Sequence, residues 1–249
     1  MIFDTHAHYN DEAYHNELDT LVSEMKNDVC GIINCATNYT SCKQTIELCE
    51  QYDGFIYAAI GVHPSELEPA FNEELLLKFI NNKHCVAIGE IGLDYHYMDF
   101  DKNEQEKWLI KQIELAQKVN KPVILHDRDS HEDMLNIIKA YKPKGVLHCY
   151  SGSVEMMREV LKCGLYIGVG GVVTFKNAKK LVECVKELPL NRLLLETDAP
   201  YLSPEPFRGK RNRSDYIKYV AEKIAEIKGL TYNEVLKANF ENTKALFGI

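Results

Sequence analysis

The stretch CVAIGEIG, residues 85–92, contains the pattern that decides the fold. It is a short and mainly apolar run, which is typical of a β-strand that is covered on both faces. A longer segment with interspersed apolar and polar residues, 104–119, follows it, and we expect this segment to form a helix. One strand followed by one helix is the repeating unit of α/β proteins.

The same unit recurs along the whole chain. The predicted strands span residues 1–5, 29–35, 55–61, 85–92, 122–126, 145–150, 165–170 and 192–198. The predicted helices span residues 11–27, 40–51, 72–81, 104–119, 130–140, 153–162, 176–187 and 214–227, with a last helix at 231–239. Eight such units predict a single (β/α)8 TIM barrel over residues 1–249, a fold that commonly has about 250 residues. A doubly wound open sheet is the alternative, but it usually has fewer units and a glycine-rich turn after its first strand, which this sequence lacks.

The charge of the chain limits the kinds of partner that it can bind. Its 29 basic and 37 acidic side chains give a formal net charge of −8 at neutral pH. This balance argues against a protein that coats nucleic acid through bulk positive charge, although it leaves room for a local basic patch. No obligate protein partner is evident from the sequence.

The cysteines and the hydropathy pattern bear on the compartment. None of the eight cysteines forms a C-x-x-C pair, so we expect reduced, buried thiols rather than a thiolate zinc site. No secretory signal precedes residue 4, and no run of about 18 apolar residues could span a membrane. We therefore expect a cytoplasmic protein.

Polar side chains gather where the predicted strands end. His6 and His8 alternate at the end of the first strand and therefore face the same way. Further candidates at or after strand ends are His63, Glu90, Asp94, His126, His148 and Asp198. Each of them alone has an ordinary structural interpretation, such as a hydrogen-bonded neutral imidazole. The carboxyl ends of barrel strands meet at one mouth, however, so we expect these side chains to lie together.

The mixture of imidazoles and carboxylates predicts a metal centre. Such donors suit divalent zinc, manganese, iron or magnesium. Six donors exceed the three protein ligands of a typical catalytic zinc ion, so we expect two ions about 3.5–4 Å apart, bridged by the two oxygens of Glu90. Two cations lower the pKa of a nearby water, and Asp198 would orient that water and accept its proton. The sequence therefore predicts a hydrolase with Glu90 and Asp198 in catalytic roles.

Seven motifs in order resemble the TatD family of metal-dependent hydrolases. They are DTHAH (4–8), GVHP (61–64), GEIGLDY (89–95), HDR (126–128), HCYSG (148–152), ETDAPYL (196–202) and RGKRN (208–212), and the match extends to ENTKALF at 241–247. The resemblance implies a TIM barrel with deoxyribonuclease activity, typically 3′→5′ exonuclease action on single-stranded DNA. It also implies two divalent ions, with Mg²⁺, Mn²⁺ and Zn²⁺ as candidates.

The resemblance also assigns the metal ligands. One ion would be held by His6, His8, Glu90 and Asp198, and the other by Glu90, His126 and His148. HCYSG has Tyr150 where many relatives have Phe, which leaves the ligand His148 unchanged.

Three residues near the ligands have candidate supporting roles. Arg128 is expected to contact a substrate phosphate or, alternatively, to form an ion pair across the mouth. His63 is expected to contact substrate or help proton transfer, and its alternative role is to brace a loop. Glu196 lies two residues before Asp198 on the same strand face, so we expect it to hold a ligand histidine.

The long segment 199–213 contains a dense basic cluster, Arg208, Lys210, Arg211 and Arg213. We expect Arg208 and Lys210 to bind DNA, and the alternative is a solvated loop. Aromatic residues of the predicted mouth loops could stack bases or simply pack. They are Tyr95, Tyr97, Tyr150, Tyr201 and Phe207.

Two other functions are compatible with the same motifs. The activated water could attack an ester or amide carbonyl instead, as in a deacylase that acts on D-aminoacyl-tRNA. A metal-binding scaffold without enzymatic activity is the third hypothesis, but a scaffold does not need an open hydrolytic site.

Overall fold

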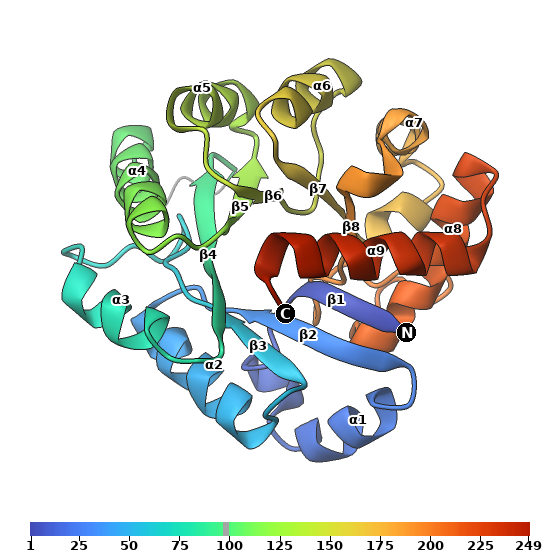
Figure 1. Ribbon diagram of the computed structural model, residues 1–249, viewed down its shortest axis with the longest axis horizontal. Helices are drawn as coiled ribbons and strands as arrows, with labels where there is room; N and C mark the ends of the chain where they lie inside the picture. Colours follow the sequence, from blue (N-terminus) through green and yellow to red (C-terminus); the bar gives the residue numbers. More distant parts are fainter. Residues whose placement is uncertain (97–99) are drawn as a thin grey trace.

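A computed structural model describes residues 1–96 and 100–249 of the chain. Its eight parallel strands are neighbours in chain order, and their helices surround them (Figure 1). The strands are β1 (Ile2–Ala7), β2 (Val29–Cys35), β3 (Ile56–Ala59), β4 (Cys85–Asp94), β5 (Val123–Arg128), β6 (Gly145–Leu147), β7 (Tyr166–Val169) and β8 (Leu193–Leu195). This architecture confirms the predicted TIM barrel.

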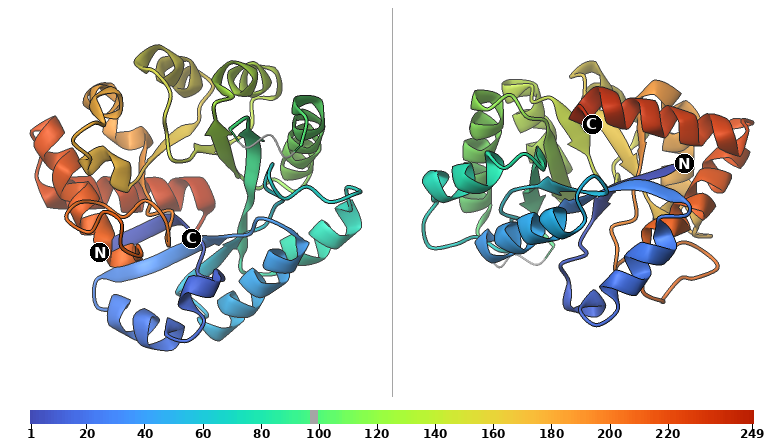
Figure 2. Two further views of the ribbon diagram at one scale, coloured as in Figure 1. Left: turned by 180° about the vertical axis from the view of Figure 1, so that it is seen from behind. Right: turned by 60° about the horizontal axis from the view of Figure 1, so that its bottom comes forward.

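Nine α-helices lie within the described residues. They are α1 (Leu18–Met25), α2 (Tyr39–Gln51), α3 (Glu73–Ile80), α4 (Lys102–Lys118), α5 (His131–Tyr141), α6 (Val154–Lys162), α7 (Lys179–Glu187), α8 (Ile217–Lys228) and α9 (Tyr232–Phe247). Figure 2 shows the barrel from behind and tilted, with the loop between β8 and α8 in orange. No helix in these two described ranges is long and apolar enough to cross a membrane.

Successive strand residues contribute to two different hydrophobic clusters. Ile32 packs in a large cluster with helix residues, whereas Ile33 packs in a smaller cluster with Phe3, Ile124 and Leu194 from other strands. Because strand side chains alternate in direction, the smaller cluster fills the barrel and the larger one lies beneath the helices. Strands buried on both faces explain the nearly continuous apolar runs in the sequence.

The barrel closes where β1 meets β8. Ala7 and Ala199 form a parallel bridge, and the His8 N–H donates to the Ala199 carbonyl at 2.7 Å. The Asp198 N–H donates to the His6 carbonyl at 2.9 Å. This seam places the polar residues that follow β8 beside those that end β1.

Two of the predicted helices differ from those observed by more than three residues at one end. The predicted helix 11–27 is interrupted, because a short 3-10 helix at Glu12–Tyr14 precedes α1. Tyr14 is fully buried there and its hydroxyl donates to the Asn212 carbonyl, a tertiary contact that fixes the chain before α1. The last helix runs to Phe247 rather than residue 239, since Leu246 and Phe247 are buried in the smaller cluster.

Candidate metal centre

The six predicted ligands lie together at the carboxyl ends of the strands. His6, Glu90 and His126 lie on β1, β4 and β5. His8, His148 and Asp198 lie shortly after β1, β6 and β8. Their side chains approach one another to within 4 Å around the carboxylate of Glu90, so the structure brings the whole predicted set into one cluster.

The two oxygens of Glu90 face different pairs of imidazoles. Oε2 lies 3.3 Å from His6 Nε2 and 3.5 Å from His8 Nε2. Oε1 lies 2.8 Å from His126 Nδ1 and 2.9 Å from His148 Nε2. The donors therefore form two groups that share one buried carboxylate.

The first group has the spacing of ligands around a single cation. His6 Nε2 and His8 Nε2 are 3.1 Å apart, and Asp198 Oδ1 lies 3.6 and 3.4 Å from them. Two donors bound to one tetrahedral ion at about 2.0–2.2 Å lie about 3.3–3.6 Å apart. His6, His8, Glu90 and Asp198 thus fit a divalent ion without a large rearrangement.

The second group includes His63, for which the sequence suggested a substrate contact, a part in proton transfer or the bracing of a loop rather than a place among the metal ligands. His63 Nε2 lies 3.8 Å from Glu90 Oε1, and its ring centroid is 4.4 Å from that of His126. Donor atoms of His63, Glu90 and His126 all lie within 4.8 Å of one another, which is close enough to hold an ion. Burial and the neighbouring His126 lower the pKa of His63 to about 3, so its imidazole is neutral.

Two hydrogen bonds orient the imidazoles. His8 Nδ1 lies 2.9 Å from the Cys35 carbonyl, which can only accept a hydrogen bond, so Nδ1 carries a proton and Nε2 faces Asp198. His126 Nε2 lies 3.1 Å from Asp94 Oδ2, which leaves Nδ1 facing Glu90. Histidines that bind metals are typically held in this way through their second nitrogen.

Charge in the cluster keeps its carboxylates ionised. Burial alone would raise the pKa of Glu90, but His148 and His6 lower it well below its usual range. Burial likewise opposes ionisation of Asp198, yet the interactions with His8 and His6 lower its pKa. Two ionised carboxylates together with several imidazoles form a donor set that divalent cations prefer.

Asp94 and His126 also stabilise each other in their charged forms. Burial opposes the charge on both side chains, but the hydrogen bond between them lowers the pKa of Asp94 to about 2. The bonds to Asp94 and Glu90 raise the pKa of His126 to about 9. Asp94 is thus an ionised acceptor directly beside a candidate ligand.

A family model described as TatD related DNase matches residues 3–248. The chain belongs to the TatD family. A metal-dependent hydrolase of Bacillus subtilis, YabD, is 46% identical over 255 residues, with all of both chains covered. The Escherichia coli metal-dependent hydrolase YcfH is 34% identical over all of this chain and 96% of its own.

Solved structures agree with these relatives. The Escherichia coli TatD homologue YJJV has a TM-score of 0.92 and 32% identity, with 100% of this chain and 98% of that chain covered. A TatD family hydrolase from Entamoeba histolytica has a TM-score of 0.87 and 27% identity, with 99% and 97% covered. The present TatD protein is accordingly a metal-dependent hydrolase.

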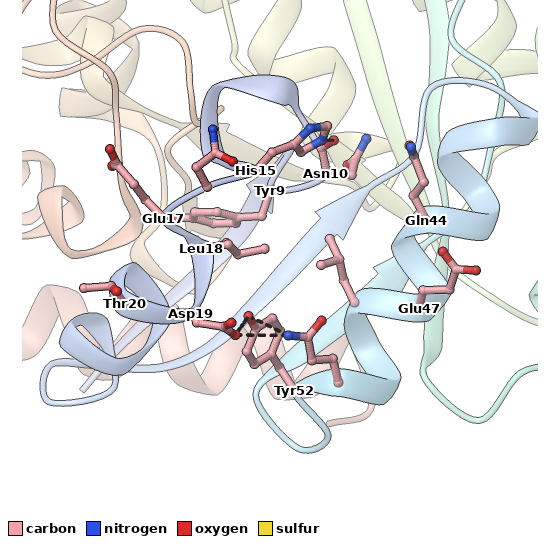
Figure 3. A pocket seen from close by; sticks show the side chains of 13 residues that line it. Tyr9, Asn10, His15, Glu17, Leu18, Asp19, Thr20, Gln44, Glu47 and Tyr52 are labelled. Carbon is pink, nitrogen blue, oxygen red and sulfur yellow. Dashed lines mark hydrogen bonds between the residues drawn. The ribbon is translucent and has the colours of Figure 1, made fainter.

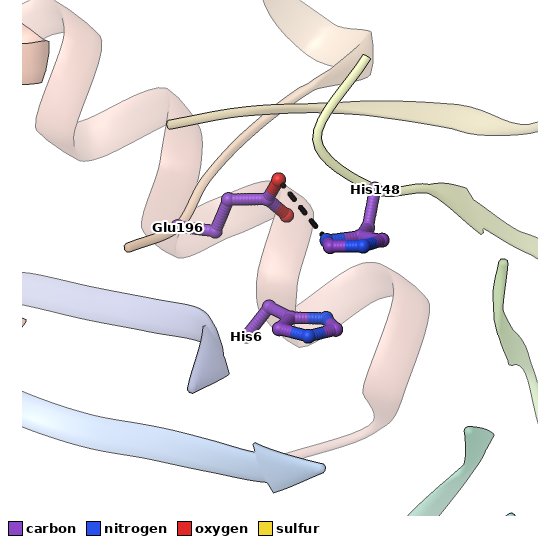
Figure 4. A group of neighbouring side chains, drawn as sticks. All are labelled: His6, His148 and Glu196. Atoms are coloured by element: carbon purple, nitrogen blue, oxygen red, sulfur yellow. Dashed lines mark ion pairs between the residues drawn. The ribbon is translucent and has the colours of Figure 1, made fainter. Parts of the chain in front are cut away.

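Figure 4 shows Glu196 beside His148. Glu196 faces Nδ1 of this ring, whereas Glu90 faces its Nε2. Glu196 Oε1 accepts from the Cys149 N–H and lies 3.6 Å from His148 Nδ1, whose ring stacks on His6 with centroids 3.9 Å apart. Residue 168 is glycine, and a Cβ there would overlap the Glu196 carboxylate. Among the described residues, His6 Nδ1, His148 Nδ1 and Glu196 Oε2 are buried without a hydrogen-bond partner. The expectation that Glu196 holds a ligand histidine stays a prediction in this TatD protein.

The candidate metal centre of this TatD protein opens into a cavity of about 770 Å³. Arg128, Tyr201 and Leu202 line it together with most of the candidate ligands. Arg208 and Lys210 are exposed outside this lining, and the Arg208 guanidinium lies 4.1 Å from the centroid of the Phe175 ring.

Acidic partners occupy part of the basic cluster. Arg211 pairs with Glu17, and Arg213 pairs with Glu24 and Asp215. Of the candidate stacking aromatics, Tyr150 is buried, Phe207 stacks on Tyr216, and Tyr95 donates its hydroxyl to Asp133. Tyr97 lies outside the described residues.

A second cavity of about 480 Å³ lies between the segment after β1 and α2 (Figure 3). Asn10 lines both cavities. Glu17, Asp19 and Glu47 give this second cavity a negative lining, which disfavours a phosphate backbone there.

Proposed function

We propose that this protein is a deoxyribonuclease that uses two divalent ions to remove nucleotides from the 3′ end of single-stranded DNA. The proposal rests on the position of the Glu90 carboxylate. Its two oxygens face separate imidazole pairs at 2.8–3.5 Å. A carboxylate in that position suits two neighbouring cations, which is the arrangement found in many phosphodiester-cleaving enzymes. The DNase description of the family supports the same substrate class.

The chain offers a ligand set for each ion. His6, His8, Glu90 and Asp198 would hold one. Glu90, His126 and His148 would hold the other, with His63 nearby. When bound, the two ions lower the pKa of water and neutralise charge on the phosphate.

Asp198 is the candidate proton acceptor. Its side chain is partly exposed on the cavity side, whereas Glu90 is almost completely buried. Because its pKa is lowered, Asp198 is ionised at neutral pH and can take a proton from an attacking water.

Arg128 is the candidate phosphate contact. It lines the cavity next to Asp94 and His126, and its charge helps to lower the pKa of Asp94. A guanidinium there can donate two hydrogen bonds to a phosphate that also faces the metal ligands. Arg208 and Lys210 would contact more distant phosphates of the same strand, because they lie outside the cavity lining.

End-labelled single-stranded DNA incubated with the protein and Mg²⁺ or Mn²⁺ tests this proposal. We expect shortening from the 3′ end that stops in EDTA and returns with added metal. A 5′-end label and a 3′-end label on the same sequence distinguish the polarity. Protein with measured bound metal that leaves DNA intact, but releases the amino acid from D-aminoacyl-tRNA, would replace the proposal with the deacylase alternative.

A further inference from the structure

Two hydrophobic side chains are exposed beside the metal centre. Among residues 1–96 and 100–249, the exposed large hydrophobic residues are Met1, Tyr201 at 54% and Leu202 at 38%. Tyr201 and Leu202 are consecutive, and both line the cavity that contains the donor groups. Exposed apolar groups at the wall of a polar cavity are a common feature of ligand sites.

The Tyr201 ring is held in place from several directions. Its hydroxyl donates to Asp11 Oδ2 at 2.9 Å, and its backbone N–H donates to the Asp198 carbonyl at 2.8 Å. Its carbonyl accepts from Asn212 Nδ2 at 2.7 Å, and the same amide donates to the Thr197 carbonyl at 2.9 Å. Asn212 is fully buried, so the loop presents an ordered aromatic surface rather than a loose side chain.

The ring lies next to the first donor group. Its centroid is 6.4 Å from that of His8, and Tyr201 follows Asp198 by three residues. In a nucleotide the sugar separates the phosphate from the base. A phosphate at the donors would therefore direct its neighbouring base toward the wall formed by Tyr201 and Leu202.

The negative charge of Asp11 next to the Tyr201 ring also favours a base over a phosphate at this wall. Asp11 accepts the Tyr201 hydroxyl, so a negative carboxylate borders the ring and disfavours a phosphate there. A nucleobase has no net charge and has a flat face that stacks on aromatic side chains. On the cavity lining, Arg128 offers the positive charge that a phosphate needs.

We propose that Tyr201 and Leu202 form a stacking platform for the nucleobase that adjoins the scissile phosphate. This inference rests on the proposed nuclease function and adds the part of the substrate that the mouth recognises. Base-on-aromatic stacking of this kind changes affinity by about 5- to 150-fold per base. The platform accepts any base, because it reads a flat face rather than a hydrogen-bonding edge.

The test compares two single-stranded oligonucleotides, one with an ordinary 3′-terminal nucleotide and one with an abasic terminal nucleotide. We expect the wild-type enzyme to prefer the first by about 5- to 150-fold in kcat/KM. Tyr201→Ala should bring this ratio close to one. Tyr201→Phe keeps the ring and loses only the bond to Asp11, so it should retain most of the preference.

Tyr219→Ala is the matched control, because Tyr219 packs against Phe207 and is outside the cavity lining. It should leave the ratio unchanged. A second measurement does not depend on turnover: 2-aminopurine at the 3′ terminus should lose fluorescence on binding to wild type and Tyr201→Phe, but not to Tyr201→Ala.

The outcomes separate the two proposals. Wild-type cleavage of DNA with an equal ratio in wild type and Tyr201→Ala, and equal quenching, would overturn the platform and leave the nuclease intact. Quenching that depends on Tyr201 without any DNA cleavage by metal-loaded protein would support the platform and reject the nuclease. An unquenched base in every variant would reject the platform whatever the cleavage result.

Discussion

Replacing Asp198 by Asn should abolish most of the turnover while the protein stays folded. The exchange keeps the size of the side chain but removes a negative charge 3.4 Å from His8 Nε2 and 3.6 Å from His6 Nε2. Although burial opposes its charge, Asp198 has a lowered pKa and can accept a proton throughout the neutral range, which an amide cannot. Positioned acid–base groups contribute about 100- to 10,000-fold to rates. We therefore expect kcat to fall by that factor, which corresponds to about 2.7–5.4 kcal/mol in the barrier.

The fold should survive because two hydrogen bonds that hold residue 198 in place are made by its backbone groups. Its N–H donates to the His6 carbonyl, and its carbonyl accepts from the Tyr201 N–H. Both bonds remain available after the substitution. The backbone of Asp198 is left-handed with φ 58°, a conformation that asparagine tolerates well. We expect a Tm close to that of the wild type.

The assay is single-turnover cleavage of end-labelled single-stranded DNA by protein with measured Mn²⁺ content. Asp215→Asn removes a charge from the segment after β8, where Asp215 pairs with Arg213, and should keep nearly the wild-type rate. Asp198→Asn with a full metal complement and undiminished kcat would refute the proton-accepting role. If Asp198→Asn lost its metal, the loss of turnover would follow from the ligand role of Asp198, and the proton-accepting role would lose its support.

Three other changes test neighbouring parts of the site. Glu90→Gln should lose bound metal as well as activity, because an oxygen that faces imidazoles becomes an NH2 group; two retained ions per chain by mass spectrometry would contradict this. Arg208→Ala combined with Lys210→Ala should weaken DNA binding and reduce the slope of log Kd against log salt by up to about 1.4, and an unchanged slope would exclude phosphate contacts. Asp94→Asn should weaken Mn²⁺ binding by about 10- to 100-fold in calorimetry, because an ionised carboxylate no longer orients His126; an unchanged affinity would show that this bond is dispensable.

The alternation of strands and helices could be predicted from the sequence because every strand is buried on both faces. The interruption before α1 could not, since it depends on Tyr14 bonding to Asn212, 198 positions away. The length of α9 could not be predicted from the sequence either. Leu246 and Phe247 continue that helix because they pack in the smaller cluster, and a local pattern does not reveal that partner.

The clustering of donors could be predicted for a topological reason: strand ends of a barrel meet at one mouth. The sequence suggested the bridging role of Glu90, but it did not show which imidazoles each of its oxygens faces. That division and the approach of His63 depend on rotamers set by packing. The bond between Asp94 and His126 depends on the β4–β5 register, which pairs Asp94 with Arg128. For Arg208, stacking on Phe175 is a tertiary contact that a charge count does not show.

The first donor group lies at the seam where the chain's first and last strands meet, and this location links the site to closure of the barrel. Below His6, the Asp4 carboxylate accepts from the Thr197 N–H and from the Ser214 hydroxyl, residues 193 and 210 positions away. These bonds join segments from the two ends of the chain, so they require that both ends have come together. The spacing among His6, His8 and Asp198 therefore exists only in the closed barrel. The second group lies on β4 and β5 and on the segments after β3 and β6, away from this seam. Loosening the seam should therefore disturb the side chains around Glu90 Oε2 and Asp198 before those around Glu90 Oε1 and His126.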